Sequence, residues 1–107
     1  MNGINDFGLS AESTEWILRA LKVFPEIDEA IIFGSRAKGT AKPGSDIDLA
    51  VKGSFPDYGF TERIRMMLQD GLNLPYFFDI VDYEHLSDQS LKEHIDRVGK
   101  VFYRKDR

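Results

Sequence analysis

Two aspartates one residue apart, Asp46 and Asp48, are the residues of this chain whose type and spacing point most directly to chemistry. They lie in an alternating segment, residues 46–51, with Ile47 and Leu49 at the intervening apolar positions. Residues i and i+2 of a strand point to the same face, about 6.5 to 7 Å apart. Such carboxylates repel one another unless a cation lies between them, and Mg²⁺ takes oxygen ligands of this kind. The pattern indicates either a divalent-metal site or two solvated aspartates on an open face.

A third carboxylate, Asp79, lies within the apolar segment 75–83, where strand propensity disfavours aspartate. If that strand neighbours the strand over residues 46–51, the three carboxylates can form one site. Two Mg²⁺ ions about 3.5 to 4 Å apart would then clamp both oxygens of an in-line phosphoryl displacement. Asp82 competes for the third position, but it stands at the strand end, where an exposed turn aspartate explains it. We therefore favour Asp79.

A Gly-Ser step, Gly34 followed by Ser35, comes directly after the apolar segment 29–33. Glycine allows a phosphate to approach the backbone closely, and free N–H groups at a helix start attract anions. The serine hydroxyl can donate to a phosphate oxygen. By itself, however, the step is more typical of a plain strand-to-helix turn with Ser35 as the cap. Three cations close by either face a triphosphate or are solvated in the loop: Arg36, Lys38 and Lys42.

The candidate residues are positioned by the surrounding helices and strands. Apolar residues at helical spacing predict three helices. We expect Ser10 and Ser87 to be the N-caps of the first and last helix, and Gly99 to follow the last one. A single helical turn is expected directly after the Gly-Ser step. The three predicted helices cover residues 9–24, 60–70 and 88–98.

Short apolar or alternating segments predict three strands, with a fourth short segment as a candidate edge strand. The three segments are residues 29–33, 46–51 and 75–83, and the edge candidate is 101–104. Helices therefore alternate with strands along the chain. This order predicts an α/β fold, in which helices pack on a small mixed β-sheet.

Length and composition limit the classes of protein that the sequence can represent. A chain of 107 residues fits one domain. A net charge of −4 argues against non-specific nucleic-acid binding, and the lack of cysteine excludes disulfides and thiolate metal sites. No apolar run approaches the ~20 residues that span a bilayer, and the first residues do not form a signal peptide. We therefore expect a cytoplasmic protein that does not bind a membrane.

The chain resembles the polymerase-β-type nucleotidyltransferase superfamily in one signature. This signature is a Gly-Ser step, ten further residues and then the Asp-Ile-Asp segment. The longer segment 33–51, FGSRAKGTAKPGSDIDLAV, is similar to the small MNT branch, the minimal nucleotidyltransferases. The resemblance extends over nearly the whole chain. It implies one minimal nucleotidyltransferase domain over residues 1–107, with the polymerase-β-like fold. Lys38 stands where the family often has arginine, and it cannot make a bidentate phosphate contact.

The resemblance implies a nucleotide-binding role for four residues. Gly34 and Ser35 would hold the phosphates of ATP or another nucleoside triphosphate, and Arg36 and Ser45 would also contact the nucleotide. The acceptor would attack the α-phosphorus, so that a nucleoside monophosphate is transferred and pyrophosphate is released.

The resemblance further implies that Asp46 and Asp48 bind two Mg²⁺ ions. Asp79 would complete the site of the ion that activates the acceptor hydroxyl. These three aspartates are therefore the expected metal ligands and catalytic residues, and geometry and charge neutralisation would replace a dedicated protein base.

The resemblance finally implies a partner, an all-helical HEPN-type protein. Small members of the family are similar to antitoxins that attach AMP to a tyrosine of a HEPN toxin. Phe55, Tyr58 and Phe60 are candidates for a partner surface, although core packing explains them equally well. Two alternatives stay open: a binding module that neutralises its partner by contact, and transfer of a nucleotide to a small molecule. We expect no direct contact with nucleic acid, and an assembly with a partner or a second copy is compatible with the sequence.

Overall fold

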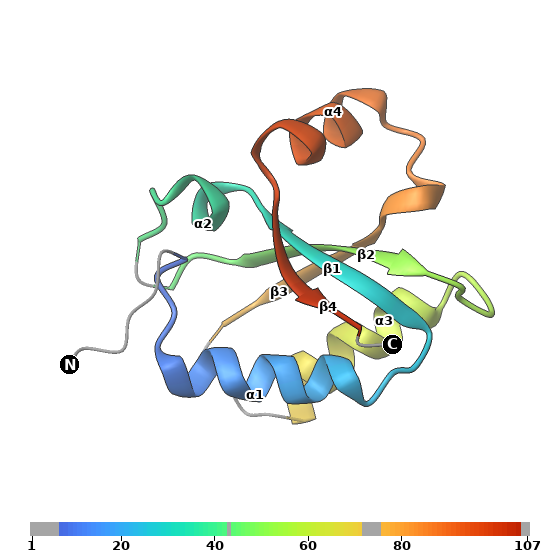
Figure 1. The fold of residues 1–107 in the computed structure, drawn as a ribbon, viewed down its shortest axis with the longest axis horizontal. Helices are drawn as coiled ribbons and strands as arrows, with labels where there is room; N and C mark the ends of the chain where they lie inside the picture. The colour runs from blue at the N-terminus through green and yellow to red at the C-terminus, as the bar shows by residue number, and fades with distance from the viewer. Residues whose placement is uncertain (1–6, 43, 72–75, 106–107) are drawn as a thin grey trace.

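A four-stranded sheet forms the centre of the computed structural model, which describes residues 7–42, 44–71 and 76–105. The strand order is β3-β2-β1-β4. β1 pairs antiparallel with both β2 and β4, whereas β3 pairs parallel with β2 (Figure 1). The strands are β1 (Ile27–Phe33), β2 (Ile47–Gly53), β3 (Phe78–Asp82) and β4 (Lys100–Arg104). The predicted small mixed sheet and the candidate edge strand are confirmed.

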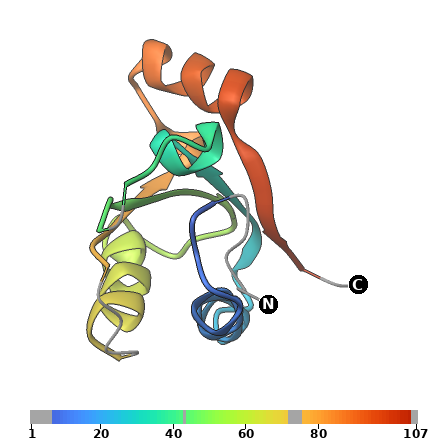
Figure 2. The same cartoon turned by 90° about the vertical axis from the view of Figure 1, so that its left-hand side faces the viewer.

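Helices cover the two faces of the sheet unequally. Figure 2 shows α1 and α3 against one face and α4 against the other, while α2 follows the end of β1. The helices are α1 (Ala11–Lys22), α2 (Ser35–Lys38), α3 (Phe60–Met66) and α4 (Gln89–Val98). Within the described ranges, no helix is long and apolar enough to cross a membrane.

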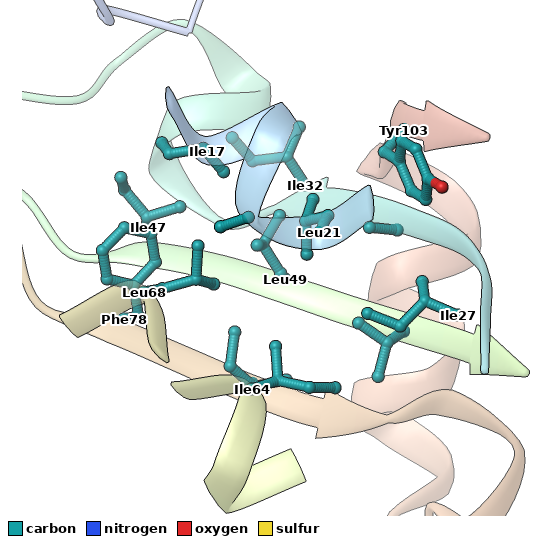
Figure 3. Packing of buried hydrophobic residues seen from close by; sticks show 14 of the residues in the cluster. Ile17, Leu21, Ile27, Ile32, Ile47, Leu49, Ile64, Leu68, Phe78 and Tyr103 are labelled. Atoms are coloured by element: carbon teal, nitrogen blue, oxygen red, sulfur yellow. The ribbon is translucent and has the colours of Figure 1, made fainter. Parts of the chain in front are cut away.

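The main core lies between the sheet and the pair α1 and α3. Alternate residues of β2 point into it, among them Ile47 and Leu49, which are at most 1% exposed. Figure 3 shows Ile17 and Leu21 of α1 in the same cluster. Because side chains alternate along a strand, Asp48 must point to the opposite face.

A smaller apolar cluster lies on that opposite face, under α4. Phe33, Ala50 and Ile95 form its buried part. Ala50 follows Asp48 by two residues on this face, and Phe33 is the register partner of Asp48, so Asp48 lies at the border of this cluster.

The helix ends show where the sequence interpretation was right and where it was wrong. Ser10 is the N-cap of α1, as predicted, and its Oγ accepts from the backbone N–H of Ser13 at 3.0 Å. Ser87 is not the N-cap of α4. Asp88 holds that position, because its carboxylate accepts from the backbone N–H of Leu91 at 3.1 Å.

Gly99 follows α4 as predicted, but in an extended conformation, with φ −67° and ψ 150°. Space rather than a left-handed turn requires glycine here. A Cβ on Gly99 would lie 2.5 Å from the carbonyl oxygen of Ile95 and 2.6 Å from Cγ2 of Ile31.

Two other predicted elements differ in detail. The helix expected over residues 60–70 is α-helical only as far as Met66 and continues as a π-helical turn, Met67–Gly71. The predicted third strand is shorter than expected, because β3 begins at Phe78. Residue 75, where that strand was expected to start, lies outside the described residues.

Candidate active site

The three predicted carboxylate residues stand at the start of two neighbouring strands. Because β2 and β3 are parallel and in register, Asp48 lies opposite Asp79. Neighbouring strands are separated by about 4.8 Å, so these two residues are direct neighbours across the sheet. Asp46 precedes the first residue of β2. The condition on which the prediction of Asp79 depended, that the third strand neighbours the second, is therefore met.

Asp82, the competing candidate, lies at the other end of β3. Its register partner is Val51, and its Oδ2 lies 2.8 Å from Nδ1 of His85. Asp82 is half-buried rather than an exposed turn residue, and its Oδ1 is buried without a hydrogen-bond partner in the described part of the chain. Asp82 therefore lies three residues further along β3 than Asp79, away from Asp48, and the exposed turn position expected for it is not observed.

The environment of Asp48 disfavours its charge. The side chain is half-buried, whereas Asp46 and Asp79 are exposed. Burial and then the neighbouring carboxylates, first Asp79 and next Asp46, raise the pKa of Asp48 from 3.8 to about 6, and the Arg36 guanidinium opposes this shift. A group in this position is stabilised by a cation.

Gly34 is required by a close approach to that carboxylate. The antiparallel register pairs Phe33 with Asp48, which brings the next residue, Gly34, under the Asp48 side chain. Gly34 has φ +75°, and a Cβ there would lie only 2.5 Å from Oδ2 of Asp48. The sequence interpretation explained this glycine by the close approach of a phosphate to the backbone. The structure adds a second reason, because the backbone and the carboxylate share the same space.

Ser35 begins α2, directly beside this contact. The helix is only four residues long, so we assign little weight to its dipole. Its carbonyl oxygen accepts from the backbone N–H of Thr40 at 3.0 Å and from the Thr40 hydroxyl at 3.3 Å. α2 ends at Gly39, which is left-handed at φ +77°. The turn after β1 is thus closed by its own backbone.

Arg36 lies in a different environment from the one implied by its expected role on the nucleotide. The side chain is 1% exposed. Its guanidinium donates to the carbonyl oxygens of Ser45, Phe7 and Gly8 at distances of 2.7 to 3.3 Å. Its central carbon also lies 5.1 Å from the centre of the Tyr76 ring. Burial lowers the pKa of Arg36, and the surrounding groups act against this shift. The structure directs this cation to the backbone rather than to solvent.

Ser45 closes a tight turn in the loop before β2. Its Oγ accepts from the backbone N–H of Lys42 at 2.9 Å, and its own N–H donates to the Lys42 carbonyl at 3.0 Å. Lys38 and Lys42 are exposed, and neither has an ion-pair partner within the described ranges. Two cations therefore lie near the carboxylates in sequence and remain open to solvent.

Phe77 is an aromatic residue at the site that sequence reasoning did not single out. It is 70% exposed, whereas the next residue, Phe78, is 4% exposed. Its carbonyl accepts from the backbone N–H of Ile47 at 2.8 Å, which places its backbone beside Asp46. The signal available in the sequence was the strand alternation itself, because Phe77 and Asp79 stand two residues apart.

The candidate partner surface divides into core and surface residues. Phe60 is 4% exposed and belongs to the main core, and Phe55 stacks on it with the ring centres 5.2 Å apart. Core packing therefore explains Phe60. Tyr58 is 96% exposed and is the member of this group that remains available for contacts.

Among the described residues, no three His, Cys, Asp or Glu side chains form a ready-made metal centre. The strand register brings the backbones of Asp48 and Asp79 side by side, and Asp46 flanks them. The arrangement can provide carboxylate oxygens on one side and the Gly-Ser backbone on the other. Such a combination suits a phosphate-bearing substrate bound together with a hard cation.

Comparison with known proteins agrees with this geometry. A family model described as polymerase beta, nucleotidyltransferase matches residues 15–107, which include all the candidate site residues. A Haemophilus influenzae protein named "Probable protein adenylyltransferase MntA" is 34% identical over 76 residues. That match covers 70% of this chain and 65% of the relative, so it spans less than two thirds of the relative's length.

Two solved structures share the fold. A crystal structure of a toxin-antitoxin with AMP-PNP has a TM-score of 0.68 and 25% identity, over 92% of this chain and 76% of that one. A tri-AMPylated Shewanella oneidensis HEPN toxin in complex with an MNT antitoxin has a TM-score of 0.67 and 21% identity. The second match covers 91% of this chain and 74% of that one, and it concerns the fold alone.

Proposed function

The chain belongs to the polymerase beta nucleotidyltransferase family, and from that premise we propose that it transfers AMP from ATP onto a hydroxyl group of a partner protein. The observation that carries the proposal is the strand register: β3 pairs with β2 so that Asp79 lies beside Asp48, and β1 pairs with β2 so that Gly34 lies against Asp48. A half-buried carboxylate beside a second one is unfavourable in a domain that only needs to fold. It is favourable where a cation and a triphosphate bind.

The donor chemistry of the site suits Mg²⁺. Hard divalent cations take carboxylate oxygens together with substrate phosphates. Burial and then the neighbouring carboxylates raise the pKa of Asp48, and a bound cation would favour its charged form. We assign Asp46, Asp48 and Asp79 as the ligands of two ions. When bound, Mg²⁺ supplies neutralisation of the phosphate charge and activation of the acceptor hydroxyl.

The chain's own residues divide the substrates across the sheet. Gly34 and Ser35 follow β1, and we assign them to the triphosphate, with the backbone and the serine hydroxyl as donors. Asp79 lies on β3, on the far side of Asp48 from that step. The acceptor therefore approaches from the β3 side.

The transfer is a displacement at the α-phosphorus. The acceptor oxygen forms a bond to that atom, the bond to the departing pyrophosphate breaks, and the hydroxyl proton is released. The protein's contribution is to hold the reacting groups in line in a fixed field of charges.

We assign the acceptor to an all-helical HEPN-type toxin, with this chain as the antitoxin. Support comes from the relatives: one carries the name probable protein adenylyltransferase, and two solved structures of like fold are a toxin-antitoxin with AMP-PNP and a HEPN toxin in complex with an MNT antitoxin. The presence of AMP-PNP in one of them supports ATP as the donor.

Labelling tests the proposal directly. The protein is mixed with Mg²⁺, ATP labelled at the α-phosphate, and the all-helical product of an adjoining gene. We expect label on that partner with the wild type and with Asp82→Asn, an aspartate at the other end of β3, and none with Asp48→Asn. Label on a small molecule would favour that acceptor class. Equal inhibition of the partner by wild type and Asp48→Asn, with nothing labelled, would show that the protein acts by contact.

A further inference from the structure

We propose that Arg36 is the positioning residue that joins the phosphate-binding step to the carboxylates. The inference rests on the proposed function, because it concerns how the same site is assembled. Arg36 follows Gly34 and Ser35 in the chain, and its side chain reaches the residue that precedes Asp46. One side chain thus connects the two halves of the site.

Arg36 makes two hydrogen bonds to Ser45. Nε of Arg36 donates to the Ser45 carbonyl oxygen at 3.2 Å, and Nη2 donates to the same oxygen at 2.7 Å. Asp46 is the next residue, and it lies before the first residue of β2, so the strand ladder does not fix it. The guanidinium therefore holds the backbone at the point where the chain delivers Asp46.

The other side of the guanidinium is held by the segment before α1. Nη1 donates to the carbonyl oxygens of Phe7 at 2.9 Å and Gly8 at 3.3 Å. Gly8 has φ +73°, and a Cβ there would lie 3.3 Å from Nη1. The Tyr76 ring, just before β3, packs on the guanidinium plane. Three other segments of the chain, at residues 7–8, 45 and 76, meet on this one group.

Only arginine has the chemistry for this position. Its planar group offers five N–H donors in a fixed fork, whereas the lysine ammonium is a single point that cannot serve both sides. A buried cation is tolerated when it is hydrogen-bonded, and Arg36 makes four hydrogen bonds to the carbonyl oxygens of three residues. Asp46 and Asp48 also favour the charge, since both act to raise the pKa of Arg36 against burial.

Arg36 acts through the backbone and not by touching the nucleotide. A side chain that is 1% exposed, with its donors directed to carbonyl oxygens, is not presented to a phosphate. Its loss would release the loop between α2 and β2 and allow Asp46 to move relative to Gly34. The consequence is weaker binding of the cation and nucleotide together.

Calorimetric titration with Mg²⁺ and AMP-PNP tests this at a temperature where circular dichroism shows every variant folded. We expect Arg36→Lys to bind at least tenfold more weakly than the wild type. The matched control is Ile27→Val, a core change at the opposite end of β1, where Ile27 pairs with Gly53. It lowers the melting temperature but should leave the affinity unchanged.

Hydrogen exchange in the ligand-free protein separates positioning from direct contact. We expect the amides of residues 39–47 to exchange faster in Arg36→Lys and unchanged in Ile27→Val. A residue that only contacted the nucleotide would leave the ligand-free exchange as it is in the wild type, and that result would overturn the proposal.

Folded Arg36→Lys that binds as tightly as the wild type would also overturn it. If Arg36→Lys does not fold, Tyr76→Leu, which removes the ring from the guanidinium, decides by the same two measurements. Unchanged affinity and exchange in Tyr76→Leu would then contradict the proposal. If the wild type itself does not bind AMP-PNP, the proposed function fails, and the exchange measurement alone decides the role of Arg36.

Discussion

The folded structure disfavours the ionised form of Asp48, because this side chain is half-buried near Asp79 and Asp46. Its pKa is raised from 3.8 to about 6. Between these two values the folded state binds more protons than the unfolded chain, so the stability contributed by this group falls as the pH rises through that window. Above about pH 6, the cation-free protein bears the full penalty.

Asp48→Asn should therefore stabilise the cation-free protein at pH 7. After discounting for solvent screening, we expect a gain of about 1 kcal/mol, or roughly 4 °C in melting temperature. The measurement is thermal unfolding in a chelator from pH 4.5 to 7.5, with wild type and variant compared at each pH. The difference should grow as the pH rises. A difference that shrinks over this range would contradict the assigned environment of Asp48.

Gly34 should be intolerant of any side chain. Gly34→Ala places a Cβ 2.5 Å from Oδ2 of Asp48 at a positive φ, so we expect a loss of at least about 2 kcal/mol in the free energy of unfolding, measured in urea. Gly39→Ala is the control, because Gly39 also has a positive φ (+77°), but apart from its chain neighbours no atom of the described residues lies within 4 Å of its Cβ position. It isolates the backbone strain and should cost less.

A double-mutant cycle then isolates the contact itself. If the clash is with the Asp48 carboxylate, Gly34→Ala should cost less in an Asp48→Ala background than in the wild type. Additive costs would mean that the Gly34 backbone and the Asp48 carboxylate do not share the same space.

At the scale of elements, hydrophobic periodicity and strand propensity were sufficient to predict which segments form helices and which form strands. The β2 alternation, with Ile47 and Leu49 buried and Asp48 outside the main core, is read directly from the sequence. The proximity of Asp48 and Asp79 could not be read from the sequence, since it depends on β3 pairing with β2, which periodicity does not specify. That pairing was stated as a condition, and the structure meets it.

The contacts of Arg36 lay beyond sequence reasoning for the same physical reason. Its hydrogen-bond partners are backbone carbonyls of Phe7, Gly8 and Ser45, and every residue type has such a carbonyl. No composition or spacing marks them. The start of α4 is a smaller case, because Ser87 and Asp88 are both good N-cap residues and only the chain path selects between them.

The N-cap of α4 gives a prediction at this scale. Asp88→Ala should lower the free energy of unfolding by about 1 kcal/mol, because it removes the acceptor for the Leu91 N–H, whereas Ser87→Ala should change it by less than about 0.5 kcal/mol. Urea unfolding of the two single variants provides the measurement. Equal losses, or a larger one at Ser87, would show that the helix begins elsewhere.

For the whole molecule, the sheet order distributes the candidate residues over three strands. β1 leads into the Gly-Ser step, β2 carries Asp48, and β3 carries Asp79. Under the proposed function, nucleotide, cations and acceptor would therefore follow one another across three neighbouring strands. The main core packs against the opposite face of the sheet, while α4 covers part of the face that carries Asp48. The site is thus built from backbone register, and its weakest point is the loop that Arg36 secures.

The central claim is that the crowded carboxylates are made for a cation and a nucleotide. The most direct test is the melting temperature of wild type and Asp48→Asn as Mg²⁺ and AMP-PNP are added together. A ligand at 100 times its dissociation constant stabilises a folded protein by about 2.7 kcal/mol. The wild type should therefore gain several degrees, and Asp48→Asn should gain little from its own higher starting point. No rise in the wild type, or an equal rise in both proteins, would contradict the claim.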